Sequence, residues 1–111
     1  MSCPDTRVLV VRTANLDGRS GAQLVPAARD SFADGATCLV IDLSVVTYMD
    51  SLGIAVLAEI LHRAPPGARL CLAGLQHRVR AVARLTRLHE VFTIYPTIAD
   101  AQRAEATARA S

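Results

Sequence analysis

The sequence predicts an α/β domain in which a mostly parallel sheet of four to five strands packs against about four helices. Short apolar runs rich in β-branched residues alternate along the chain with longer stretches whose apolar residues recur at helical spacing. Repeated strand and helix units of this kind form parallel sheets with right-handed crossovers. With 51% hydrophobic and 20% charged residues, the 111-residue chain has the composition of one globular domain spanning residues 1–111.

The first predicted unit is a strand, a turn and a helix. Arg7 to Thr13 is a β-branched run, and Asn15 to Gly18 is rich in turn-forming residues. The helix that follows ends at Asp34-Gly35. One face of this helix is expected to carry the apolar residues Leu24, Val25, Ala28 and Phe32.

The second unit contains the most apolar strand of the chain. Thr37 to Leu43 is almost continuously apolar, as expected for a strand covered on both faces, and we therefore place it in the middle of the sheet. A loop containing Val45, Val46 and Tyr48 follows. Ser51 to Arg63 is the next predicted helix, stopped by the Pro-Pro-Gly sequence that begins at Pro65. Its expected inward residues are Ile54, Leu57, Ala58 and Leu61.

The remaining elements repeat the same alternation. Arg69 to Ala73 and Val91 to Tyr95 are predicted strands, and Gln76 to Leu88 is the helix between them. An alanine-rich helix from Thr97 closes the chain. The inward residues expected for the helix between the strands are Val79, Val82, Ala83 and Thr86.

The composition excludes several functions. All twelve positively charged residues are arginine, so Schiff-base catalysis and a lysine-dependent phosphate loop are absent. Aromatic residues make up only 4% of the chain, which removes the stacking platforms of single-stranded nucleic-acid binders. We therefore expect no direct nucleic-acid contact and interpret one arginine-rich helix face as a solvated surface. That face carries Arg78, Arg80, Arg84 and Arg87.

No cofactor, metal or membrane site is predicted. The cysteines form no C-x-x-C pair and are expected to be reduced thiols: Cys3, Cys38 and Cys71. The histidines lack the spacing of metal ligands: His62, His77 and His89. The chain has neither an apolar run of membrane length nor a secretory leader, so the expected compartment is the cytoplasm.

Polar residues gather where two predicted strands end. Asp17 follows the first strand, and Asp50-Ser51 follows the second strand at the entrance to a helix. Because the carboxyl ends of parallel strands lie at one edge of a sheet, we expect both groups at the same edge. A hydroxyl at a helix N-terminus faces unpaired N–H groups, which favour a phosphate there. The pattern thus predicts a phosphorylatable serine at position 51.

A purely structural interpretation of the same residues stays open. Asp50 or Ser51 could serve only as an N-cap, because these residue types cap helices in every class of protein. A hydrolase triad built on Ser51 is disfavoured, since no G-x-S-x-G sequence surrounds it and no histidine is tied to it by the pattern.

The segment Val40 to Leu57, with the sequence VIDLSVVTYMDSLGIAVL, resembles the signature of the STAS domain, the fold of bacterial anti-sigma factor antagonists. A buried strand ending in Asp-Leu is followed by an apolar loop and by Asp-Ser-x-Gly at the start of an amphipathic helix. Leu16-Asp17 after the first strand is a second matching piece. The order of elements fits a STAS-like domain over nearly the whole chain.

The resemblance implies a non-enzymatic regulator that switches partners. Ser51 would be the phosphoacceptor of an anti-sigma factor that is itself a serine kinase. Unphosphorylated protein would bind that factor and free its sigma factor, phosphorylated protein would release it, and a phosphoserine phosphatase would reset the switch. The resemblance places the partner-binding surface at Asp17, Asp50, Ser51, Leu52 and Gly53.

Some positions depart from the family pattern and keep other functions open. Ala14 and Asn15 replace a Gly-Glu turn, and Leu52 stands where many phosphorylated members have Ser or Thr. Little chain precedes Arg7 for the edge strand that usually comes first. Leu52 and the first-turn substitutions favour a second hypothesis, a scaffold subunit of a transport or sensory assembly that is not phosphorylated. A ligand-binding or enzymatic α/β domain is the third hypothesis.

Overall fold

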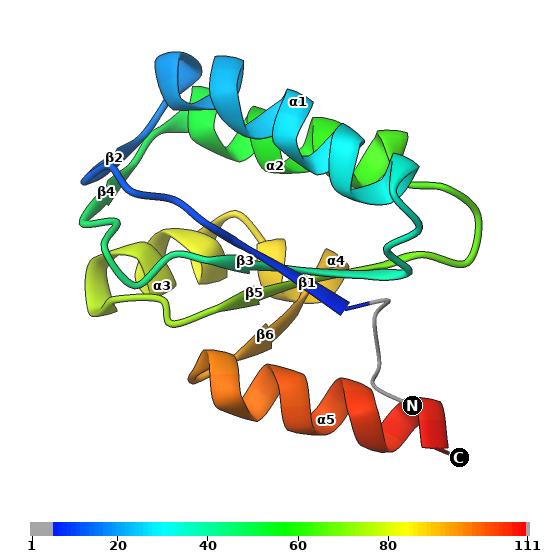
Figure 1. The fold of residues 1–111 in the computed structure, drawn as a ribbon. Helices are drawn as coiled ribbons and strands as arrows, with labels where there is room; N and C mark the ends of the chain where they lie inside the picture. The colour runs from blue at the N-terminus through cyan, green and yellow to red at the C-terminus, as the bar shows by residue number, and fades with distance from the viewer. Residues whose placement is uncertain (1–5, 111) are drawn as a thin grey trace.

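Two parallel sheets organise the chain in the computed structural model, which describes residues 6–110 (Figure 1). The main sheet has the strand order β1-β3-β5-β6, and a two-stranded sheet pairs β2 with β4. All pairings are parallel, as predicted. The strands are β1 (Thr6–Val10), β2 (Asn15–Leu16), β3 (Cys38–Asp42), β4 (Tyr48–Met49), β5 (Arg69–Ala73) and β6 (Thr93–Tyr95).

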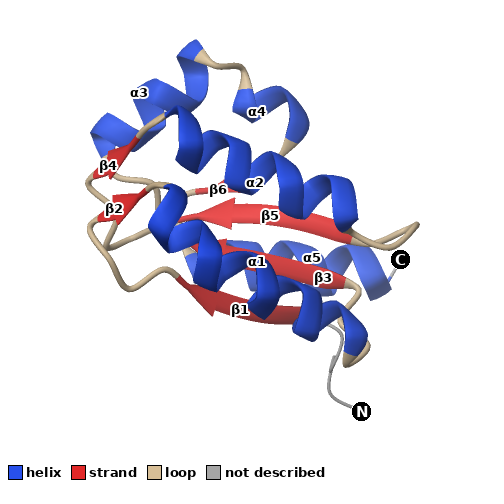
Figure 2. Cartoon of the chain, turned by 90° about the horizontal axis from the view of Figure 1, so that it is seen from above, coloured by secondary structure: helices blue, strands red, loops and turns tan. Residues whose placement is uncertain are grey.

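The helices cover the main sheet unequally. The described helices are α1 (Gly18–Ala33), α2 (Ser51–Arg63), α3 (His77–Leu85), α4 (Leu88–Val91) and α5 (Ile98–Ala110). Figure 1 shows α1 and α2 side by side over one face of the sheet and α5 alone beneath the other face. The view from above places α3 and α4 beside α2 (Figure 2). The result is a three-layer α/β arrangement. Separately, no helix among residues 6–110 is long and apolar enough to cross a membrane.

Strand β3 lies between β1 and β5, and its five residues are all buried, which confirms the predicted central strand. Because successive strand residues point to opposite faces, β3 contributes to two cores. Leu39 and Ile41 belong to the larger core under α1 to α4. Cys38 and Val40 belong to a smaller core under α5.

The predicted helix from Gln76 to Leu88 is in fact two helices. Helix α3 ends at Leu85, where the Thr86 hydroxyl donates to the Val82 carbonyl oxygen at 2.7 Å. Arg87 then adopts a left-handed conformation with φ 61°, which turns the chain into α4. Thr86 is therefore exposed and not inward as predicted.

Four further predictions require correction. Strand β1 ends at Val10 instead of Thr13, and Val91 ends α4 instead of opening a strand. The inward face of α2 is rotated, so Ile60 is buried and Ala58 is exposed. Strands β2 and β4 were expected to be turn and loop. Two-residue strands carry too short a pattern to be recognised from sequence.

Helix α5 is attached to the sheet by a buried carboxylate. Glu105 is only 1% exposed. Arg69 Nε lies 2.6 Å from its Oε1, and Arg69 Nη2 and the Tyr95 hydroxyl donate to its Oε2 at 3.1 and 2.9 Å. This network ties α5 to β5 and β6 by charge-assisted hydrogen bonds.

Cys38 and Cys71 lie beside this carboxylate, and one potential ligand atom from each of the three residues falls within 4.8 Å of the others. The hydrogen bond with Cys71, together with burial, raises the pKa of Cys38, so this thiol stays protonated. Glu105 already accepts hydrogen bonds from Arg69 and Tyr95, as given above. We interpret the cluster as packing and attachment. Cys3 lies outside the described residues.

The Glu105 network should make stability depend on pH. Burial raises the pKa of Glu105, but the hydrogen bonds from Arg69 and Tyr95 outweigh it, and the net pKa lies below the usual 4.5. This contribution to stability is full above about pH 4.5 and is lost as the pH falls through the folded-state pKa. Burial raises the pKa of Tyr95 from 10.0 to about 12, so its contribution is full below about pH 10 and is lost as the pH rises through 12.

We expect Glu105→Gln to lower the free energy of unfolding at neutral pH by about 1–3 kcal/mol, because Arg69 and Tyr95 lose a charged acceptor. Urea unfolding at a series of pH values measures this effect and should show a shallower loss of stability in acid for the variant. Glu59→Gln is the control, since the Glu59 carboxylate meets Arg63 on an exposed helix face. Identical acid slopes for Glu105→Gln and the natural chain would contradict the assignment.

Candidate functional site

Strands β2 and β4 place two aspartates next to each other. The register pairs Asn15 with Tyr48 and Leu16 with Met49. Asp17 and Asp50 are the next residue of each strand, so both follow the carboxyl ends of the small sheet. Each aspartate is also the N-cap of a helix, Asp17 of α1 and Asp50 of α2. The structure therefore brings the two predicted acidic groups to one edge of the molecule.

Asp50 performs the capping that the sequence left open between two residues. Its Oδ1 accepts a hydrogen bond from the Gly53 N–H at 2.9 Å. Ser51 is the first residue of α2 and is exposed. Among the described residues, none forms a hydrogen bond with the Ser51 hydroxyl. The purely structural interpretation therefore applies to Asp50, and the serine side chain is left accessible beside the helix N-terminus.

Asp17 is held in the same way at the start of α1. Its Oδ1 accepts hydrogen bonds from the Arg19 N–H at 3.0 Å and the Ser20 N–H at 3.1 Å. The bond from the Ser20 N–H is the main cause that lowers the pKa of Asp17, so the carboxylate remains ionised in mild acid. Asp17 thus contributes a fixed negative charge near the first turn of α2.

Gly53 permits α2 to approach the loop before α1. A Cβ atom added at this position would lie 2.0 Å from the Leu16 carbonyl oxygen, which is far inside van der Waals contact. Gly53 is itself buried, and Leu16 is 0% exposed. The backbone that packs against Gly53 is that of Leu16 in the same chain, and not that of a partner. Gly53 therefore contributes to the surface around Ser51 only indirectly, by positioning α2.

Apolar side chains flank the exposed serine. Leu52 is 58% exposed, and Tyr48 is 56% exposed. A Cβ added at Gly18 would lie 3.5 Å from Leu52 Cδ1, so the first turns of α1 and α2 are in contact. From the sequence, Tyr48 is predicted only as a loop residue, because its pairing with Asn15 is a contact between distant segments. Leu52 and Tyr48 are thus exposed apolar residues within three positions of Ser51 in the sequence.

No histidine or cysteine forms a hydrogen bond with Ser51, Asp17 or Asp50 in the described part of the chain. The arrangement can present a hydroxyl, two carboxylates and apolar side chains to a visiting protein. It is chemically suited to binding and to accepting a phosphoryl group from elsewhere.

Comparisons with known proteins agree on one family. The STAS domain family matches residues 4–101. The chain is 28% identical to the anti-sigma-F factor antagonist RsfB of Mycobacterium tuberculosis over 111 residues, covering 91% of each protein. A crystal structure of an anti-sigma factor antagonist from Mycobacterium paratuberculosis aligns with a TM-score of 0.80 and 28% identity, over 94% of this chain and 88% of that one.

The fold also occurs in a protein of a different description. A sulfate transporter family protein from Wolinella succinogenes aligns with a TM-score of 0.84 over 96% of this chain and 89% of that chain. Its sequence identity is 13%, so the likeness is one of fold alone.

The contact between Gly53 and Leu16 makes a stability prediction. We expect Gly53→Ala to lower the free energy of unfolding by roughly 1–3 kcal/mol, because the new methyl group would overlap a backbone carbonyl that cannot rotate away. Gly18→Ala is the matched control in the first turn of α1, where the added methyl group meets Leu52 only at ordinary contact distance. It should leave stability unchanged or raise it by up to about 1 kcal/mol. Urea unfolding of both variants measures the difference, and equal stabilities would refute the close approach.

Proposed function

Because the chain belongs to the STAS domain family, we propose that it acts as an anti-sigma factor antagonist that binds an anti-sigma factor through the surface around Ser51. We further propose that the partner is a serine kinase and that phosphorylation of Ser51 ends the complex. The names of the RsfB relative and of the Mycobacterium paratuberculosis protein support the first part. Phosphate transfer is assigned to the partner, and a phosphoserine phosphatase would restore the binding form.

The observation that carries the proposal is the accessible hydroxyl of Ser51 at the start of α2. Asp50 supplies the cap, so phosphorylation of Ser51 would break no hydrogen bond within the described chain. The helix N-terminus would stabilise the added phosphate by roughly 0.3–1 kcal/mol. Phosphorylation of Ser51 is therefore compatible with the fold, and we expect it to change the affinity for a bound partner and not the stability of the domain.

The charge around Ser51 explains how a phosphate could act as a switch. Phosphorylation adds about −1.5 to −2 charges at neutral pH beside the carboxylates of Asp17 and Asp50. A partner that packs against Leu52 and Tyr48 would have to cover this charge or leave it in contact with its own groups. Unless the partner provides new cations there, the complex is weakened by desolvation and repulsion.

The proposed surface combines five residues with different tasks. Leu52 supplies exposed apolar area, and Ser51 supplies the modifiable hydroxyl. The two aspartates supply charge and hold the helix starts, while Gly53 positions α2. The competing scaffold hypothesis uses the same exposed Leu52 for docking but requires no phosphate on Ser51, so modification distinguishes the two functions.

Phosphorylation gives the first test. Incubation with an ATPase-type anti-sigma factor encoded beside this chain's gene, together with ATP, should add one phosphate that intact-mass spectrometry detects. Ser51→Ala should abolish the added mass. Ser44→Ala is the control, because Ser44 is also exposed but lies in the loop after β3. A phosphate that persists in Ser51→Ala would refute the assignment, and a natural chain that stays unmodified would contradict regulation by phosphorylation of Ser51.

Binding gives the second test. Ser51→Asp places a fixed negative charge at the start of α2, and we expect it to weaken binding to the anti-sigma factor by tenfold or more, which corresponds to about 1.4 kcal/mol. Ser51→Asn has nearly the same shape without the charge and should bind much closer to the natural affinity. Calorimetric titration measures both. Equal affinities for the two variants would remove charge as the mechanism of release.

A further inference from the structure

Strand β1 is an open edge of the main sheet. It pairs with β3 on one side, and among residues 6–110 no strand pairs with its other side. The Val11 N–H donates to the Asp42 carbonyl oxygen at 3.0 Å, so it points toward β3. Because backbone groups alternate along a strand, those of Val8 and Val10 point away from the sheet. They form a row of donors and acceptors able to hydrogen-bond to another strand.

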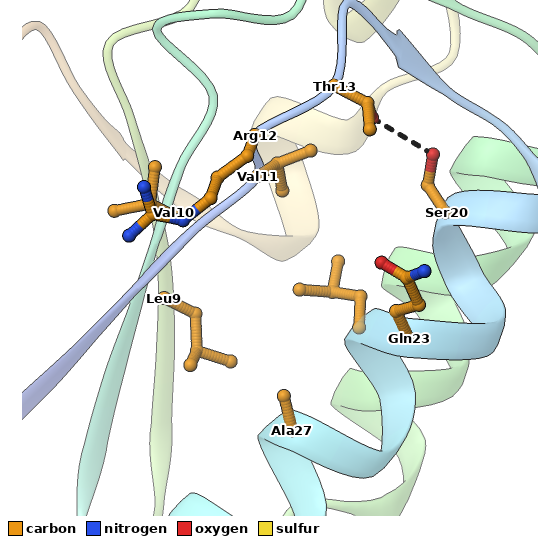
Figure 3. Close-up of a pocket in the computed structure, with 9 residues that line it drawn as sticks. Leu9, Val10, Val11, Arg12, Thr13, Ser20, Gln23 and Ala27 are labelled. Carbon is orange, nitrogen blue, oxygen red and sulfur yellow. Dashed lines mark hydrogen bonds between the residues drawn. The ribbon is translucent and has the colours of Figure 1, made fainter.

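A groove runs between this edge and helix α1. It has a volume of about 220 Å³. It lies between residues 9–13, at the end of β1 and just after it, and the N-terminal part of α1 (Figure 3). Leu9, Val11, Leu24 and Ala27 give it an apolar floor. Its polar rim consists of Thr13, Ser20 and Gln23, and the Thr13 and Ser20 hydroxyl oxygens lie 3.2 Å apart.

Within residues 6–110, β1 contains no proline or lysine, and no other strand covers its outer side. Proteins block such edges with proline, lysine, bulges or a covering segment. Residues Val8 to Val11 are four consecutive apolar residues, and Val10 is 39% exposed. An open edge beside an apolar groove is the arrangement used for strand addition, in which backbone bonds provide affinity and alternate side chains enter a pocket.

Charge identifies the kind of segment that fits. Arg12 follows β1 in the sequence. Its side chain, like that of Val10, points away from α1 (Figure 3). Arg12 is exposed, and within the described chain no acidic residue pairs with it. Strand β1 itself contains no acidic residue, and Arg7 at its other end makes only a 3.9 Å contact with Asp34. Residues 6–12 contain two arginines and no carboxylate, so an acidic segment complements this edge in charge.

We propose that the outer edge of β1 binds an extended segment of a partner protein, which adds a strand to the main sheet. Alternate apolar side chains of this segment enter the groove between β1 and α1, and an acidic side chain on its other face pairs with Arg12. Ser51 does not line this groove, although Ser20 on its rim donates to Asp17, so the two proposals are tested with separate variants.

A capped eight-residue peptide of alternating valine and glutamate is the probe. Titration into the full chain, labelled with ¹⁵N, should shift the amide resonances of Val8 and Val10 and slow their hydrogen exchange. Val10→Pro removes an outward N–H without removing a bond to β3, and an edge strand tolerates proline at such a position. We expect this variant to unfold at nearly the natural temperature and to bind the peptide at least tenfold more weakly.

Charge reversal completes the test. A peptide with lysine in place of glutamate should bind more weakly than the glutamate peptide, and Arg12→Glu should reverse that preference. Ser51→Asp should leave peptide binding unchanged, so failure here and failure of the proposed switch at Ser51 are distinguishable. The proposal is overturned if the amides of Val8 and Val10 do not respond, or if Val10→Pro binds equally well. It is also overturned if those amides become protected only as the protein concentration rises, because that would show self-pairing.

Discussion

The contact between the Leu16 carbonyl and Gly53 is the constraint on which the site depends. A carbonyl oxygen occupies the space that a side chain at position 53 would fill. The contact brings the strand before α1 against the first turn of α2, and the β2–β4 pairing sets their register. The N-termini of α1 and α2, which are distant in sequence, therefore lie at the same edge of the molecule. Without this approach, Asp17 and Ser51 would have no common surface to offer.

The two aspartate caps separate structural work from exposed chemistry. Asp17 and Asp50 each accept hydrogen bonds from N–H groups in the first turn of the helix that follows. The residues next to them in the sequence are therefore not needed as caps. The hydroxyl of Ser51 is the group made available in this way. The same caps keep two negative charges at the edge. A phosphate added to Ser51 would be tolerated by the fold, because it would lie at a helix N-terminus, but it would add to the charge that repels an acidic partner.

The main sheet supports this edge and differs between its two faces. The larger core under α1 to α4 is built mostly from aliphatic side chains, with Met49 and Phe92 among them, whereas α5 is held on the other face by the buried carboxylate of Glu105 and its partners. Strand β3 is covered on both faces and by both neighbours, but β1 has an open side among the described residues. Among the described residues, the sheet is therefore fully covered at its central strand and open to further pairing at one edge.

Prediction from sequence succeeded where a local pattern was long. The apolar run through β3 and the helical spacing of α2 indicated both elements and their order, and the aspartates and serine after the strands indicated an edge with polar groups. It failed where the deciding contact was distant or the element short. The break at Arg87, the rotated face of α2 and the pairing of Asn15 with Tyr48 all depend on neighbours that no local window contains.

The sequence alone determined the α/β class, the central strand and the residue types at the strand ends, because hydrophobic periodicity and helix-start chemistry are local properties. Tertiary structure decided that Asp50 is the cap and that Ser51 is accessible. It also decided that Gly53 admits the chain's own backbone and that Glu105 is buried against Arg69. These outcomes depend on distances between segments far apart in the chain, which packing sets and residue order does not record.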